Sequence, residues 1–182
     1  MQRRTALKNL LIIAGGTVLL PSCVQQDKKV SIPLDNLKLS AEQENLLAQI
    51  AETIIPATDT PGAKALGVHQ FVLTMMDDCA DKEQQDDFMK GLNEINDLSK
   101  KQYNNLFIKC SPQQQLELLT RIDKKEFDGK VNDVFKATKG LTIQGYTKSK
   151  YVMSNLLVYE LVPGRFHGSF PIKDKKRFEQ NG

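Results

Sequence analysis

The densest group of side chains that could do chemistry is an acidic cluster in the middle of the chain. Its members are Asp77, Asp78, Asp81, Glu83, Asp86 and Asp87. Neighbouring carboxylates can serve as general acid and general base, provided that a cleft shifts their pKa values. Carboxylates also stabilise helix N-termini, where backbone N–H groups lack partners. Because the cluster lies at a predicted junction between two helices, we interpret it as structural, with its members capping helices and facing solvent.

Motifs for cofactors and metals are missing from the sequence. There is no Gly-x-Gly, hence no dinucleotide fingerprint, and no glycine-rich phosphate loop. His69 and His167 are far apart in sequence, and no cysteine pair has the spacing of a zinc or haem site. Cys79 and Cys110 could form one bridge, but two buried or partly buried thiols are the simpler interpretation. We predict that this chain has no catalytic residue and binds no cofactor or metal.

The first 23 residues indicate export. Arg3 and Arg4 precede an apolar stretch, residues 10–20, that ends shortly before Cys23. The arginine pair resembles the twin-arginine signal, which sends folded proteins, often with a cofactor in place, across a membrane. The apolar stretch has about half of the roughly 20 residues that a membrane-spanning helix needs. It is therefore interpreted as the core of a signal peptide.

Cys23 is the predicted lipid-attachment site. It follows a small residue, and Leu20 stands three positions before it, as in the lipobox of bacterial lipoproteins. An ordinary cleaved signal with an incidental cysteine is the alternative. Removal of residues 1–22 takes away three positive charges and brings the formal net charge of +3 close to zero, which gives no support for nucleic-acid binding. We predict an exported protein, lipid-anchored to the membrane at the periplasmic face of the cell envelope.

Apolar residues at helical spacing predict a mostly α-helical protein with one domain. We expect a signal peptide at 1–22, a lipidated tether at 23–39 and a helical domain at 40–182. About five helices are expected, near residues 40–55, 71–79, 81–105, 112–125 and 131–145, with a short helical turn opened by Thr60-Pro61. Beyond Tyr151 the pattern weakens, and we expect an irregular C-terminal segment that wraps the bundle, extended at 158–164.

Several blocks of the sequence resemble the gluconate 2-dehydrogenase subunit 3 family. The first block is residues 50–63, Ile-Ala-Glu-Thr-Ile-Ile-Pro-Ala-Thr-Asp-Thr-Pro-Gly-Ala. Residues 145–149 and 162–168 resemble the closing blocks of that family, and residues 111–114 lie between. The resemblance spans about residues 40–172.

The resemblance implies a non-catalytic small subunit of a membrane-associated dehydrogenase. In this family the large subunit is an FAD-dependent glucose-methanol-choline oxidoreductase acting on sugars or sugar acids, and a cytochrome c subunit often takes the electrons onward. The small subunit would bind the large one, stabilise it and assist its export, while the partner holds the FAD. Not every member of the family has a lipobox like the one predicted at Cys23. The alternatives are a small lipoprotein hydrolase that uses the acidic cluster and a stand-alone ligand-binding lipoprotein.

The predicted partner interface lies in two loops and at one helix end. Prolines and a glycine stiffen the first loop, and a tight turn in the second presents an arginine beside an aromatic, a common interface anchor. The alternative is that both loops only pack on their own bundle. The candidate interface residues are Pro56, Thr58, Asp59, Pro61, Gly145, Tyr146, Pro163, Gly164, Arg165 and Phe166.

Overall fold

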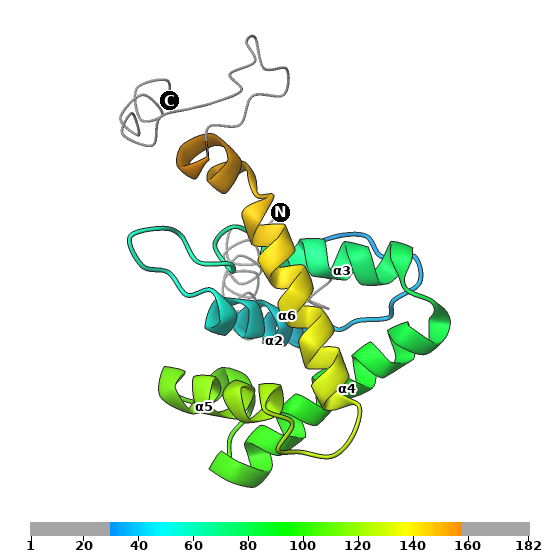
Figure 1. Cartoon of the computed structure of the whole chain (residues 1–182). Helices are drawn as coiled ribbons and strands as arrows, with labels where there is room; N and C mark the ends of the chain where they lie inside the picture. Colours follow the sequence, from blue (N-terminus) through cyan, green and yellow to red (C-terminus); the bar gives the residue numbers. More distant parts are fainter. Residues whose placement is uncertain (1–29, 158–182) are drawn as a thin grey trace, which may run out of the picture.

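The computed structural model describes residues 30–157 of the 182-residue chain. This part contains five α-helices and no strand, which confirms the predicted mostly α-helical fold (Figure 1). The helices are α2 (Ala41–Ile54), α3 (Val68–Cys79), α4 (Lys82–Tyr103), α5 (Pro112–Asp123) and α6 (Val131–Thr147). A 3-10 turn, η1 (Phe107–Lys109), precedes α5, and a π-helical turn, η2 (Val152–Leu156), follows α6.

Capping boxes fix the starts of three helices. In each box the side chain of the residue before the helix accepts a hydrogen bond from the backbone N–H three residues on. The side chain of the glutamine at that third position accepts one from the backbone N–H of the residue before the helix. The pairs are Ser40–Gln43, Asp81–Gln84 and Ser111–Gln114. Pro112 at the first position of α5 adds a residue whose backbone angle suits a helix start.

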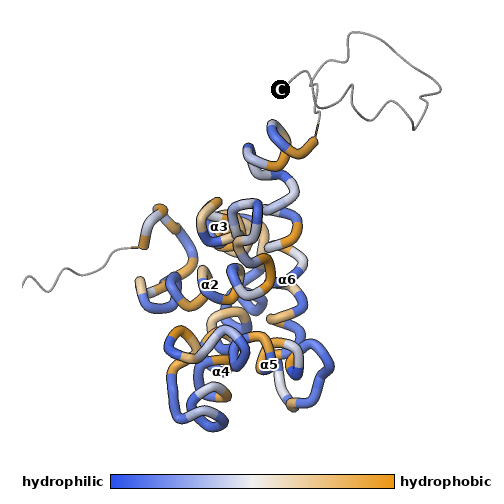
Figure 2. The backbone as a smooth tube through the Cα atoms, turned by 90° about the vertical axis from the view of Figure 1, so that its left-hand side faces the viewer, coloured by the Kyte–Doolittle hydropathy of each residue, from blue (hydrophilic) through white to orange (hydrophobic). Residues whose placement is uncertain are grey.

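The core lies where α6 crosses the other helices. Helix α6 contacts α2, α3, α4 and α5 (Figure 1). Leu47, Leu92 and Val131 are among the fully buried core residues. Gly91 lets α4 approach α6 closely, because a Cβ at this position would lie 2.7 Å from the Val134 side chain. Hydrophobic and hydrophilic stretches alternate along the helices (Figure 2), as expected of helices that bury one face.

The packed part of the chain begins before Ser40, where we expected a tether. Residues 30–39, which we call the N-terminal strap, lie against the helices. Leu37 is 5 % exposed in the core. Four partly buried residues of the strap pack beside it, namely Val30, Ile32, Leu34 and Leu39. Every second strap position from 30 to 34 is apolar, so an extended chain turns these side chains to one side. The remaining tether residues, 23–29, lie outside the described part.

Two other local predictions concern the chain after Thr60 and the C-terminal segment. Thr60-Pro61 does not open a helical turn; the chain forms hydrogen-bonded turns over residues 63–67 and enters α3 at Gly67, whose φ of 65° suits glycine. The predicted extended segment at 158–164 lies outside the described residues. Within residues 30–157, no helix is both long enough and apolar enough to span a bilayer.

Candidate functional site

The loop between α2 and α3 is held by a carboxylate from α2. Glu52 Oε1 accepts a hydrogen bond from the backbone N–H of Ala57 (3.1 Å), and Oε2 accepts one from Lys64 (2.8 Å). The backbone N–H of Ala63 donates to Ile55 O at 2.9 Å, which closes the loop at its base. One side chain therefore fixes both arms of the loop.

Gly62 is required for this arrangement. A Cβ at Gly62 would lie 2.6 Å from the backbone nitrogen of Ala57 and would also collide with the Glu52 carboxylate. Any larger residue would push apart the groups that hold the loop. Steric crowding therefore explains why the first block has a glycine at position 62, in addition to the preference of glycine for loops.

The end of α6 supports the same loop. The Tyr146 hydroxyl donates to Pro61 O at 3.1 Å and lies 3.3 Å from Thr60 Oγ1. Gly145 allows α6 to sit directly on Phe71 of α3, because a Cβ there would be 2.7 Å from the ring. Two blocks that are 85 residues apart in sequence are therefore joined at one place.

The candidate interface residues of this region fall into two groups. Pro56, Thr58 and Asp59 are exposed at the loop tip, where a partner can reach them. Pro61, Gly145 and Tyr146 are half-buried or buried and hold the loop in position. Four further candidates, Pro163, Gly164, Arg165 and Phe166, lie outside the described residues. The signal residues Arg3 and Arg4 and the lipid-attachment residue Cys23 also lie outside them.

The acidic cluster is divided among separate structural tasks. Asp81 caps α4, as predicted. Asp86 pairs with Lys82 at 2.7 Å, and Asp87 pairs with Lys130 at 2.5 Å. These carboxylates therefore have structural partners of their own.

Asp77 corrects our interpretation that the whole cluster faces solvent. It is only 4 % exposed, and its carboxylate accepts hydrogen bonds from the backbone N–H groups of Asp35 (2.8 Å), Asn36 (2.8 Å) and Leu37 (2.6 Å). Burial works to raise the pKa of Asp77, but these three hydrogen bonds outweigh it and hold the pKa below its usual value. Asp77 is the anchor of the N-terminal strap.

A second buried carboxylate, Glu44, holds the start of the strap. Glu44 is 8 % exposed and accepts hydrogen bonds from the Ser31 hydroxyl and from the Ser31 backbone N–H (2.9 Å). His69 Nε2 lies 3.6 Å from Glu44 Oε1. Burial lowers the pKa of His69, while the charge of Glu44 opposes that shift. The serine hydroxyl donates to the carboxylate and not to the imidazole, so these groups do not form an activated nucleophile.

The remaining candidate ligands are dispersed. Cys79 and Cys110 are both free thiols, as the simpler interpretation predicted, but only Cys110 is buried, and the exposed Cys79 corrects the prediction of two buried or partly buried thiols. Within residues 30–157, no three His, Cys, Asp or Glu side chains come together in a way that could hold a metal ion.

The described residues form a small helical protein in which Glu52 and Tyr146 hold the α2–α3 loop and the tip of that loop is exposed. Residues 41–164 match the family described as Gluconate 2-dehydrogenase subunit 3. The match covers more than half of the 182-residue chain, and the chain belongs to the gluconate 2-dehydrogenase subunit 3 family. It includes the α2–α3 loop and α6 and excludes the strap. Searches of curated proteins and of solved structures gave no significant match.

Proposed function

We propose that this chain is a non-catalytic accessory subunit that binds an FAD-dependent glucose-methanol-choline oxidoreductase. The observation that carries the proposal is the family match, which names a subunit of gluconate 2-dehydrogenase and covers the braced loop. The catalytic groups and the FAD belong to the large subunit in this proposal, since the small chain has no nucleotide-binding motif. A cytochrome c subunit would take the electrons onward.

The geometry of the α2–α3 loop favours partner binding. A loop that is already ordered in the free protein loses little conformational entropy on association. Glu52 and Tyr146 supply that order, and Thr58 and Asp59 present polar groups at the exposed tip. We propose that this tip contacts the large subunit and that the candidates Arg165 and Phe166 contribute to the same interface.

Export and anchoring complete the proposal. The twin-arginine pair, Arg3 and Arg4, would carry the folded subunit together with its flavin-loaded partner across the membrane. The acylated Cys23 would then anchor the complex at the periplasmic face. Stable anchoring needs more than one acyl chain or an additional membrane contact, which the complex as a whole can supply.

Co-purification of the large subunit with the tagged small subunit tests this function. Asp59→Arg should reduce recovery of the partner strongly, because it places a bulky charge at the loop tip. Gln113→Arg also introduces an arginine, at an exposed site on α5, and should leave recovery unchanged. Deletion of the gene should lower exported dehydrogenase activity without changing the turnover per flavin. Wild-type activity in the deletion strain, or equal recovery with both arginine variants, would contradict the proposal.

A further inference from the structure

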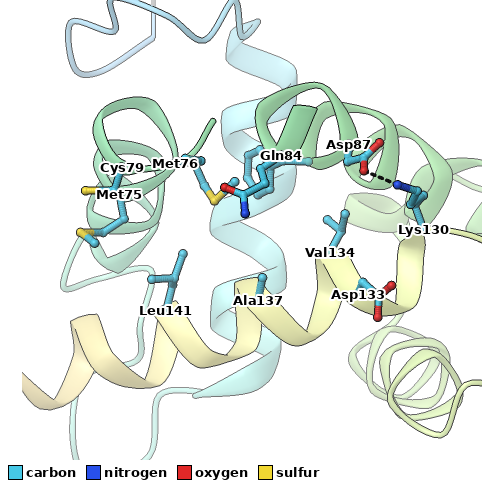
Figure 3. A pocket seen from close by; sticks show the side chains of 12 residues that line it. Met75, Met76, Cys79, Gln84, Asp87, Lys130, Asp133, Val134, Ala137 and Leu141 are labelled. Atoms are coloured by element: carbon cyan, nitrogen blue, oxygen red, sulfur yellow. Dashed lines mark hydrogen bonds and ion pairs between the residues drawn. The ribbon is translucent and has the colours of Figure 1, made fainter. Parts of the chain in front are cut away.

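An open pocket of about 430 Å³ lies between α3, α4 and α6 (Figure 3). Its walls are mainly apolar and include Met75, Met76 and Leu141. Met76 belongs to the core, whereas Met75 is half-buried at the pocket. The volume lies within the range of ligand-binding pockets, about 300–1,000 Å³.

The chemistry of the pocket fits an aromatic side chain with basic neighbours. Thioethers such as those of Met75 and Met76 make favourable contacts with aromatic rings. Asp87 and Asp133 lie at the pocket, together with Lys130 (Figure 3). Lys130 pairs with Asp87 at 2.5 Å, whereas Asp133 forms no ion pair within residues 30–157. The polar part of the pocket therefore has one more negative charge than positive.

The C-terminal segment of this chain carries a matching sequence. The aromatic Phe178 directly follows a group of four basic residues and one acid, residues 173–177. The described chain ends at Leu157, and the 21 residues from there to Phe178 can extend over about 70 Å. The 16 residues from Leu141 to Leu157 span about 24 Å if helical throughout. The segment is thus long enough to return to the pocket.

We propose that Phe178 docks in the pocket between α3, α4 and α6, with Lys175, Lys176 and Arg177 facing Asp133 and Asp87. The contact is intramolecular, so a linker of this kind gives an effective concentration of the order of millimolar. A contact with a dissociation constant of about half that value would occupy the pocket about two-thirds of the time. Docking would cover the apolar walls and keep them from other molecules. This proposal concerns the chain alone and does not depend on the dehydrogenase partner.

The exposed thiol of Cys79 lines the pocket and reports on its occupancy. We would measure the rate of alkylation of Cys79 by a bulky maleimide in the full chain, resolved by peptide mass spectrometry. Phe178→Ala should raise the rate about threefold, since the empty fraction rises from about one-third to nearly one. Phe170→Ala removes the same ring outside the basic group and should leave the rate unchanged. The buried Cys110 should stay unlabelled in all variants, which confirms that they are folded.

Two further measurements locate the contact and test its charge. A salt concentration of about 1 M, where the screening length falls to about 3 Å, should raise the alkylation rate of the wild-type chain but not that of Phe178→Ala. Benzoylphenylalanine at position 178 should form photo-crosslinks within one chain to peptides that contain Met75 or Met76. Equal alkylation rates in the two alanine variants would overturn the proposal. Crosslinks exclusively to another molecule, whether a second copy or a partner protein, would overturn it as well.

Discussion

The N-terminal strap and the α2–α3 loop are both non-helical segments that helices hold by the same chemical means. In each, a carboxylate on a helix accepts hydrogen bonds from backbone N–H groups of the segment. Asp77 of α3 binds three such groups in the strap, and Glu52 of α2 binds two in the loop. Charged acceptors make stronger hydrogen bonds than neutral ones, so both segments are firmly held.

The two segments differ in where their side chains go. The strap places Leu37 in the core, and the burial of this apolar side chain offsets the conformational entropy that the strap loses when it is ordered. The loop turns Pro56, Thr58 and Asp59 towards solvent and gains no such burial at its tip. Ordering those tip residues costs conformational entropy without a matching gain inside this chain. The strap therefore adds stability to the fold, whereas the exposed order of the loop is what the proposed contact with the large subunit would use.

The largest expected effect is loss of the strap anchor. Asp77→Ala leaves three backbone N–H groups of the strap without their acceptor, one of them in a buried hydrogen bond, and should reduce the free energy of unfolding by about 3 kcal/mol. Urea unfolding measures this loss, and hydrogen exchange at residues 35–37 should speed up. Asp78→Ala, at the exposed neighbour, should cost less than about 0.5 kcal/mol. If both variants are equally stable, the strap is not held by Asp77.

Removal of Glu52, which holds the α2–α3 loop, should reduce the free energy of unfolding by a smaller amount. Glu52→Ala frees two backbone N–H groups that lie closer to solvent, so we expect a loss of about 1–2 kcal/mol. Faster hydrogen exchange at Ala57 and Lys64 and weaker recovery of the large subunit should accompany it. Glu42→Ala, at an exposed position of the same helix, is the control for loss of a carboxylate. If the loop is loosened and recovery of the large subunit is unchanged, the order of the loop is not needed for partner binding.

Local signals made most of the fold predictable. Apolar spacing is a signal between residues a few positions apart, and all five described α-helices were predicted from it. The strap was missed because its anchor is a contact between residues about 40 positions apart. Alternating apolar residues at 30, 32 and 34 were the available signal.

The candidate site was predictable only in part. The prolines and Gly62 indicated a stiff loop, and the block pattern drew attention to Tyr146. The sequence did not reveal that Glu52 braces the loop or that the Tyr146 hydroxyl meets Pro61, since both depend on how the helices pack. The exposed tip residues differ from the residues that support them in solvent exposure. Solvent exposure depends on the folded structure and could not be seen in the sequence.

Acid should loosen the strap to a smaller extent than Asp77→Ala, because a protonated carboxyl can still accept one hydrogen bond. The folded-state pKa of Asp77 lies below its usual value of 3.8, so the carboxylate stabilises the fold above that value. This contribution is lost as the pH falls from 3.8 through the folded-state pKa. Thermal unfolding between neutral pH and pH values below 3.8 should show a steeper loss for the wild type than for Asp77→Ala. Parallel curves would assign the acid sensitivity to other groups.

The smallest effect on stability should come from the loop tip, and this prediction separates the two segments most sharply. Asp59→Ala removes an exposed side chain with no hydrogen-bond partner within residues 30–157, so the free energy of unfolding should change by less than about 0.5 kcal/mol. Leu37→Ala, the matched truncation in the strap, empties a buried site and should cost about 2–5 kcal/mol.

Partner recovery should reverse that order. Folded Leu37→Ala protein, measured below its unfolding transition, should bind the large subunit as the wild type does, because the Leu37 side chain lies in the core. Asp59→Ala should bind more weakly, by an amount that depends on how central the contact is. If Asp59→Ala binds normally and Leu37→Ala binds poorly, then contact with the partner lies at the strap, and the order of the exposed loop would need another cause.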